Sequence, residues 1–157
     1  MRMTGCAIVF GLVLAAASAS ANDTFMQLAG QWRGDGMVNY SDGTKETLHC
    51  RASYDVLKDG TDLQLSIRCA SAGYKIDLIG SAKESGGRVS GTWSEANRNV
   101  AGSLSGTAQR NRVHVLASSS ALSATLDVVT TGAKQIVTIR SQDPQSTLQG
   151  ATLSLQR

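Results

Sequence analysis

Apolar and polar residues alternate with a period of two from Thr44 to Val56, and again from Leu63 to Cys69. This period is typical of β-strands that turn one face toward a core. The apolar set falls on even positions in the first run and on odd positions in the second. Between the runs lies Asp59-Gly60, whose tolerance of positive φ suits a two-residue type I′ turn. The pattern therefore predicts a β-hairpin that folds at this turn.

The predicted hairpin places two cysteines side by side. Folding at Asp59-Gly60 sets Val56 opposite Leu63, and the same register sets Cys50 directly opposite Cys69 on the apolar face. Facing residues of an antiparallel pair lie about 4.5–5.5 Å apart by Cα, which is within the range of a disulfide. We therefore predict a Cys50–Cys69 disulfide, with two free buried thiols as the alternative. Closing this loop should add about 3 kcal/mol of stability.

The same alternation continues on both sides of the hairpin and predicts about ten short strands. The first strand is expected from Gln31 to Tyr40, with Trp32 and Val38 on its inward face. Later strands should be joined by tight turns at Ala72-Gly73, Ser85-Gly86, Ala96-Asn97, Arg110-Asn111, Ser119-Ser120 and Thr131-Gly132. Each two-residue turn moves the apolar set between even and odd positions, as a sheet with one buried face requires.

The first and last segments of the domain are less regular. Residues 22–29 are expected to form a short helical or irregular lead-in, with Phe25, Met26 and Leu28 plugging one end of the fold. Around Gln142 to Gln145 the alternation breaks, so a longer loop or a bulge is expected there. The last strand could turn either of two sets inward: Leu148, Gly150 and Thr152, or Ala151, Leu153 and Leu155.

The order of these elements indicates the fold class. Strands that follow one another as hairpins need no long crossover, and closing them into a barrel leaves no exposed sheet edge. We predict an all-β, antiparallel up-and-down meander barrel of about ten (eight to ten) strands, with a two-sheet sandwich as the alternative. One proline, 16 glycines and few aromatic residues suit such a fold. The outward set from Lys45 to Asp55 is polar, which argues against an outer-membrane barrel.

The first 21 residues have the features of a secretory signal peptide. Arg2 gives a short positive region, Cys6 to Ala17 form an apolar run too short to span a bilayer, and Ala19-Ser20-Ala21 is an A-x-A cleavage site. The first cysteine opens the apolar run instead of closing it at a cleavage site, so a lipoprotein anchor is not expected. We predict cleavage after Ala21 and a single domain over residues 22–157. The protein would then be periplasmic or secreted and would not span a membrane, a setting in which disulfides form.

Groups that could carry catalysis are sparse. His49 and His114 both fall on outward positions, so neither is expected in a cleft as a base or metal ligand. The serines lack a G-x-S-x-G turn, and no inward acid, base or nucleophile set stands out. We therefore expect no enzymatic activity, no metal and no cofactor. The net charge is +3 with scattered basic residues, so a nucleic-acid partner is not expected.

One pair of like charges is expected across the hairpin. The predicted register sets Arg51 opposite Arg68, and like charges at facing positions destabilise a sheet. Asp77, on the following strand, is expected opposite Arg68 and compensates for this repulsion. We interpret the group as a structural Arg–Asp pair, with an anion-binding site as the less favoured alternative.

Small residues are frequent on the expected inward face of the middle strands: Gly80, Ala82, Gly91, Gly102, Gly106, Ala108, Ala117 and Ala124. Such residues either let strands bend so that a small barrel can close, or leave a cavity for an apolar guest. We give slightly more weight to bending. The side chains expected to line a cavity are Trp32, Leu78, Trp93, Leu104, Val115 and Leu126. Almost no charged group accompanies them, so the ligand would be lipid-like or aromatic.

The segment Leu28 to Gly36, LAGQWRGDG, resembles the opening strand of calycin-type barrels: lipocalins, avidins, fatty-acid-binding proteins and the nitrobindin group. These proteins often begin the first barrel strand with G-x-W, here Gly30 and Trp32. The resemblance implies an antiparallel barrel whose interior or mouth binds a small, usually apolar ligand. It also implies that the tryptophan closes one end against a late arginine, here Arg140 or Arg157.

Haem binding of the nitrobindin kind would need a late inward histidine, which this chain lacks after His114. A second resemblance, through Ala29 to Trp32 and the single disulfide, is to small periplasmic barrels that inhibit secreted metalloproteases. We therefore expect an exported β-barrel that binds a small hydrophobic ligand in its interior. The alternative is a non-catalytic interaction module of the cell envelope, a scaffold or protease inhibitor with a protein partner.

Overall fold

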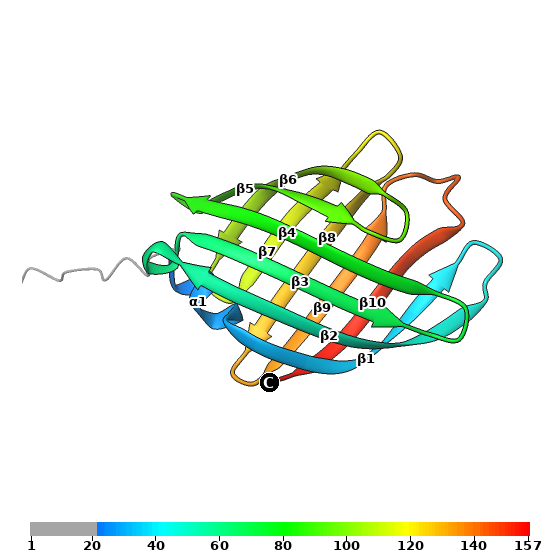
Figure 1. Cartoon of the computed structure of the whole chain (residues 1–157), viewed down its shortest axis with the longest axis horizontal. Helices are drawn as coiled ribbons and strands as arrows, with labels where there is room; N and C mark the ends of the chain where they lie inside the picture. The colour runs from blue at the N-terminus through cyan, green and yellow to red at the C-terminus, as the bar shows by residue number, and fades with distance from the viewer. Residues whose placement is uncertain (1–21) are drawn as a thin grey trace, which may run out of the picture.

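The computed structural model describes residues 22–157, in which ten strands form a closed antiparallel barrel (Figure 1). The elements in chain order are α1 (Asn22–Leu28), β1 (Gly30–Tyr40), β2 (Lys45–Leu57), η1 (Lys58–Gly60), β3 (Asp62–Ala70), β4 (Lys75–Ser85), β5 (Arg88–Glu95), β6 (Val100–Gln109), β7 (Arg112–Ser118), β8 (Ser123–Thr131), β9 (Lys134–Ser141) and β10 (Leu148–Gln156). Each strand pairs with its sequence neighbours, and β10 returns to pair with β1. The predicted meander barrel is confirmed, and the two-sheet alternative is wrong. The predicted signal peptide, residues 1–21, lies outside the described residues.

The hairpin of β2 and β3 has the predicted register. Cys50 faces Cys69, and a disulfide joins them across a Cα–Cα distance of 4.1 Å. In the turn, Asp59 and Gly60 have φ values of 56° and 95°, as a type I′ turn requires. Lys58 also adopts a positive φ, so the strands end one residue earlier on each side than a two-residue loop would allow.

Turn position is where the sequence-based predictions partly fail. The predicted registers of β3 with β4 and of β6 with β7 are confirmed. The four turns predicted at Ser85-Gly86, Ala96-Asn97, Ser119-Ser120 and Thr131-Gly132 are wrong, because each lies one residue further along the chain. Ala82 therefore faces Gly91, not Val89. The error shifts each pairing by two residues, so every side chain keeps its predicted face.

The last strand resolves the choice that the sequence left open. Ala151, Leu153 and Leu155 are buried, whereas Thr152 is exposed. A bulge against β1 changes the register, since Asn39 faces Gly150 but Tyr40 faces Leu148. A longer loop, residues 142–147, precedes the strand. The expected irregularity is therefore confirmed as both a loop and a bulge.

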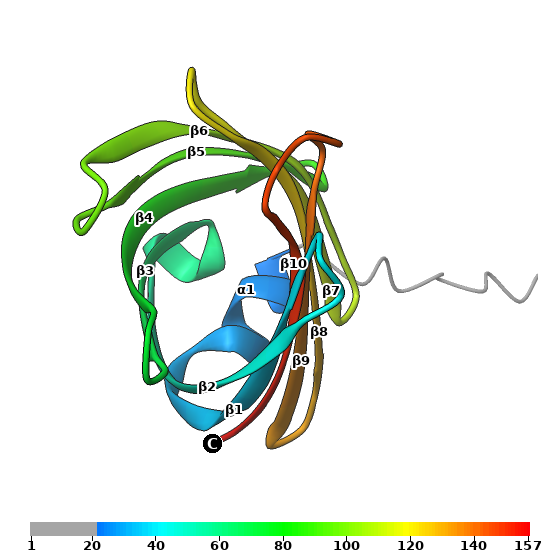
Figure 2. The same cartoon turned by 90° about the vertical axis from the view of Figure 1, so that its right-hand side faces the viewer.

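The two ends of the barrel differ. Helix α1 covers one end, and Figure 2 looks into the opposite end, which we call the mouth. Phe25 and Leu28 of α1 are buried in the core, as predicted. Met26 is not part of this plug, because 53% of its surface is exposed on the other side of the helix. Since the strands alternate in direction, the loops 41–44, 71–74, 96–99, 119–122 and 142–147 all surround the mouth.

Candidate ligand-binding lumen

Trp32 and Arg157 pack against each other at the closed end of the barrel. The Trp32 indole is fully buried, and its Nε1 donates a hydrogen bond to the Leu28 carbonyl at 2.7 Å. The Arg157 guanidinium lies 4.9 Å from the centre of the Trp32 ring and donates to the Ala29 carbonyl at 2.8 Å. Of the two arginines that the resemblance suggested, the structure selects Arg157; Arg140 lies on the outer face of β9.

Buried polar side chains also lie near this end. The Tyr54 hydroxyl donates to Gln135 Oε1 at 3.1 Å, and Gln135 Nε2 donates to Thr130 Oγ1 at 3.2 Å. Burial raises the pKa of Tyr54, which therefore stays a neutral donor. These buried side chains form hydrogen bonds with one another. They therefore need no hydrogen-bond partner from outside the chain.

Toward the middle of the barrel and the mouth, several inward apolar side chains stay partly accessible: Ile67, Leu78, Leu126, Val128, Ile139 and Leu148. The barrel is closed, so the wall separates its inner face from the outer surface. We call the inner space beside these side chains the lumen.

The predicted lining residues all lie on inner faces but in two environments. Leu78 and Leu126 are half-buried and border the lumen. Trp93, Leu104 and Val115 are buried in the wall. Val115 faces Leu126 directly across β7 and β8, so these two form one continuous apolar surface. Trp32 lies apart from the others, at the closed end beneath α1.

Glycines on the inner face allow neighbouring strands to approach each other closely. A Cβ added at Gly91 would lie 2.1 Å from the Ser81 carbonyl oxygen, and one added at Gly106 would lie 2.0 Å from that of His114. Neighbouring strands could not approach this closely with any side chain present. At these positions, the close approach of neighbouring strands explains the glycines, and they do not indicate a cavity.

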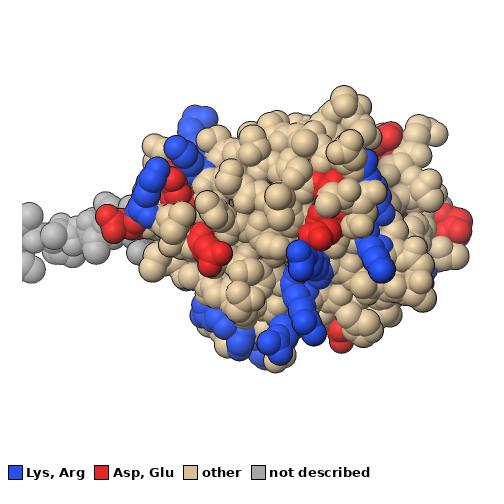
Figure 3. All heavy atoms as spheres, in the orientation of Figure 1, with Lys and Arg blue, Asp and Glu red and all other residues tan. Residues whose placement is uncertain are grey.

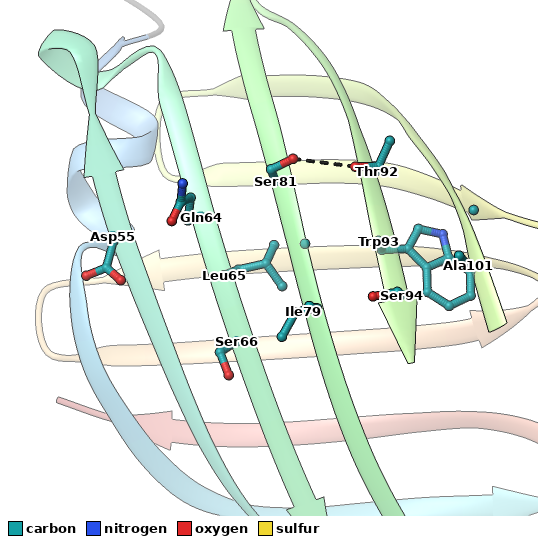
Figure 4. Close-up of a pocket in the computed structure, with 12 residues that line it drawn as sticks. Asp55, Gln64, Leu65, Ser66, Ile79, Ser81, Thr92, Trp93, Ser94 and Ala101 are labelled. Carbon is teal, nitrogen blue, oxygen red and sulfur yellow. Dashed lines mark hydrogen bonds between the residues drawn. The ribbon is translucent and has the colours of Figure 1, made fainter. Parts of the chain in front are cut away.

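A surface groove of about 670 Å³ lies over β2 to β6 (Figure 4). It is lined by outward side chains such as Gln64, Ile79 and Thr92, and inward residues such as Leu65 also border it. Ser81 and Thr92 hydrogen-bond across it at 3.4 Å. Trp93 is the predicted lining residue that borders this groove. The groove is open, and its lining combines hydroxyl, amide and aliphatic groups with the Asp55 carboxylate.

A polar and aromatic cluster forms one side of the mouth. Glu46 accepts hydrogen bonds from the Tyr40 hydroxyl at 2.9 Å, the Gly73 amide at 3.2 Å and the Ser71 hydroxyl. The bond from Ser71, followed by that from Tyr40, lowers the pKa of Glu46, and the bond to Glu46 raises the pKa of Tyr40. Sequence analysis did not identify this cluster, since its members come from the ends of β1 and β2 and from the loop 71–74.

Arg98 extends this side of the mouth. Its guanidinium lies 4.3 Å from the centre of the Tyr74 ring and 3.3 Å from Glu95 Oε2. An aromatic ring, a cation and carboxylates therefore face one another beside the apolar lumen. Such a rim can orient a ligand that has one polar end.

Two buried carboxylates correct the expectation that no inward acid is present. Glu84 and Glu95 are only 4% and 6% exposed. Burial raises the pKa of Glu95, but hydrogen bonds from the amides of Asp77, Asn97 and Arg98 and from the Asn97 side chain outweigh it and lower the pKa to about 2. Glu84 Oε1 accepts from the Gly87 amide at 2.6 Å. Each acid thus fixes a turn, and the two lie near opposite ends of the barrel.

The histidines point outward, as predicted. His49 Nδ1 lies 2.6 Å from Asp35 Oδ1, and His114 Nδ1 lies 3.6 Å from Asp127 Oδ1, all on exposed strand surfaces. Within residues 22–157, no three side chains of the metal-binding types gather into a site. Neither histidine can therefore reach a ligand in the lumen.

Comparison with known proteins identifies the fold. No family model and no curated protein matches this sequence. The structure is similar to that of Rv2717c from M. tuberculosis, with a TM-score of 0.69 and 12% identity over 88% of this chain and 98% of that chain. It is also similar to the S-type phycobiliprotein lyase CPES from Guillardia theta, with a TM-score of 0.62 and 11% identity over 88% and 92%. The barrel has a calycin-type fold. At these identities the likeness concerns the fold alone.

In this calycin-type barrel, alternation identified the inward apolar positions correctly. Alternation alone could not show which of them line free space and which are packed in the wall. The same rule, applied to strand ends, would have found Glu84 and Glu95, since each shares the parity of the buried residues on its strand. Gln135 could have been found in the same way.

Proposed function

We propose that this protein binds a small hydrophobic ligand in the lumen, which the ligand enters through the mouth. The observation that carries the proposal is the accessible inner surface around Leu78, Leu126 and Ile139 within a closed barrel. Apolar surface of this kind gains free energy when a ligand displaces water from it. The calycin-type fold supports the same proposal.

The proposed activity is binding without catalysis. Both carboxylate oxygens of Glu95 accept hydrogen bonds from backbone amides, and Glu84 lies beside the turn that follows β4, at the closed end and away from the mouth. The proposed location is periplasmic or secreted. The Cys50–Cys69 disulfide supports it, because such bonds persist in oxidising compartments. Within the described segment, no helix combines the length and the apolar character needed to cross a bilayer.

The test is uptake of a fluorescent fatty acid by the purified protein, compared between two tryptophan variants. Leu126→Trp adds bulk on the lumen side of β8, where the half-buried side chain has room. Leu116→Trp adds the same group on the outer face of the neighbouring strand β7. We expect the wild type and Leu116→Trp to bind the probe alike, and Leu126→Trp to bind at least tenfold more weakly.

Equal binding by the two variants would place the probe outside the lumen and contradict the proposal. Absence of uptake by the folded wild type would also contradict it. That result would favour the second candidate function, a protein-interaction module. The outer groove supports this candidate, because Ile79 is 55% exposed at its centre.

A further inference from the structure

Three arginines form a row on the outer face of β1, β2 and β3. Arg33 faces Arg51, and Arg51 faces Arg68, at directly opposite positions of the sheet. Facing Cα atoms in an antiparallel sheet lie about 5 Å apart, so the three side chains emerge side by side. All three are exposed, and basic side chains gather over these strands on the face shown in Figure 3. The residues are scattered in the sequence, and only the barrel brings all three together.

Fold stability does not explain this row. Like charges at facing positions destabilise a sheet. Asp77 lies 3.3 Å from Arg68 and compensates for one of them, as predicted. Within the part of the chain that the structure describes, no carboxylate lies within 4.0 Å of Arg33 or Arg51. Two adjacent cations are therefore left for an anion from outside the barrel.

The surroundings of the row add charge and shape. A groove of about 300 Å³ runs beside it and is lined in part by Arg51, Arg68 and Lys75, with Asp77 as its one acid. A guanidinium presents parallel N–H groups that bind the oxygens of a phosphate in bidentate fashion. The row thus offers several phosphate-binding groups along one line.

The neighbouring side chains indicate which anionic partner fits. On β1 to β3 the row is flanked by outward residues that are polar, charged or small: Gln31, Ser53 and Ser66 on one side, and Asp35, His49 and Ala70 on the other. The one acid among them, Asp35, pairs with His49 at 2.6 Å. A protein interface needs an apolar or aromatic centre, and single-stranded nucleic acid needs aromatic rings for stacking. Neither feature flanks the row. A membrane surface of anionic headgroups requires only exposed positive charge.

We propose that this arginine row docks the barrel on membranes rich in anionic phospholipid, with the guanidinium groups against headgroup phosphates. The proposal does not depend on a ligand in the lumen. It adds a docking surface on the outer wall, and a protein that carries lipid-like molecules would use such a surface to reach their source.

Vesicle binding tests the proposal. The row variant carries Arg33→Gln, Arg51→Gln and Arg68→Gln. The control variant carries Arg88→Gln, Lys134→Gln and Arg140→Gln, exposed residues of β5 and β9, and has the same net charge. Sedimentation with vesicles of phosphatidylglycerol and phosphatidylcholine in equal amounts measures affinity for each. We expect the row variant to bind about a hundredfold more weakly than the wild type, and the control to stay within about threefold.

Two further measurements complete the test. The wild type should not bind vesicles of pure phosphatidylcholine, and its binding to the vesicles that contain phosphatidylglycerol should weaken as the salt concentration rises. Equal losses in both variants would show an effect of net charge and overturn the assignment to the row. If the wild type binds polyglutamate or an oligonucleotide but does not bind anionic vesicles, the proposal of a membrane partner is wrong. Thermal unfolding of each variant excludes loss of fold as the cause.

Discussion

Arg157 shows how one side chain holds separate parts of the closed end together. Besides stacking on Trp32 and binding the Ala29 carbonyl, it donates to the Gly132 carbonyl at 3.1 Å. These contacts connect β10 to the start of β1 and to the turn between β8 and β9. A cation on an aromatic ring contributes about 0.5–2 kcal/mol, and the hydrogen bonds add to this.

We therefore expect Arg157→Ala to lower the free energy of unfolding by about 1–2 kcal/mol, measured by urea denaturation. Arg140→Ala is the matched control, because Arg140 is exposed and lies away from the indole. It should change stability by less than about 0.5 kcal/mol. Equal effects would show that Trp32 does not depend on the stacked guanidinium.

Glu95 should give the barrel a measurable sensitivity to acid. Its pKa in the fold is about 2, below the ordinary value of 4.5, so the ionised form stabilises the native state above pH 4.5. That contribution is lost as the pH falls toward 2. We expect Glu95→Gln to be less stable than the wild type at pH 7, and the difference, about 3 kcal/mol, to vanish near pH 2. Urea denaturation across this range measures it.

The control for the acid dependence is Asp55→Asn, which removes an exposed carboxylate that forms no ion pair within residues 22–157. Its difference from the wild type should stay near zero at every pH. A constant difference between Glu95→Gln and wild type across the range would contradict the assigned role of the turn hydrogen bonds.

At the scale of strands, the sequence predicts faces more reliably than pairings. Cys50 and Cys69 must face each other to form their bond, so the register of β2 with β3 could be predicted fully. Between β4 and β5, turns at Ser85-Gly86 and at Gly86-Gly87 bury the same set of side chains. Only the backbone distinguishes them: both glycines adopt positive φ, which the second turn requires.

The candidate site was predictable to a similar extent. Alternation along a strand is a local signal, and it placed Leu78 and Leu126 on the inner wall. The cluster around Glu46 depends on two loops that meet at the mouth, 41–44 and 71–74. Arg51 facing Arg68 was predicted from the hairpin register, but Arg33 joins them only through the register of β1 with β2. Alternation along a single strand records neither the cluster nor the full row.

The glycines of β6 should be sensitive to the smallest substitution. Gly106→Ala places a methyl group 2.0 Å from the His114 carbonyl oxygen, so the strands must move apart. We expect a loss of about 1–3 kcal/mol in the free energy of unfolding. Gly73→Ala is the control, since its nearest atom would be 3.6 Å away and its φ is not positive. If both variants unfold alike, close approach does not explain the inner-face glycines.

For the molecule as a whole, the disulfide acts mainly on the unfolded chain. The cross-link spans 19 residues of sequence and joins the middle of β2 to the end of β3. We expect the variant Cys50→Ala and Cys69→Ala to lose about 3 kcal/mol of stability and to unfold in one transition. Calorimetry with circular dichroism measures both. Unchanged stability, or two separate transitions, would show that the hairpin folds independently of the barrel.

Closure between β1 and β10 means that the barrel does not depend on the order in which its strands are joined. Residues 33 to 39 pair with the last strand in one continuous register, although more than one hundred positions separate the two strands. Arg157 already touches the carbonyls of Gln27 and Ala29. A rearranged chain could therefore run from Arg157 through a short linker into α1 and start instead within the loop 142–147. Each strand would keep both neighbours, so the wall would be unchanged while one loop at the mouth was opened.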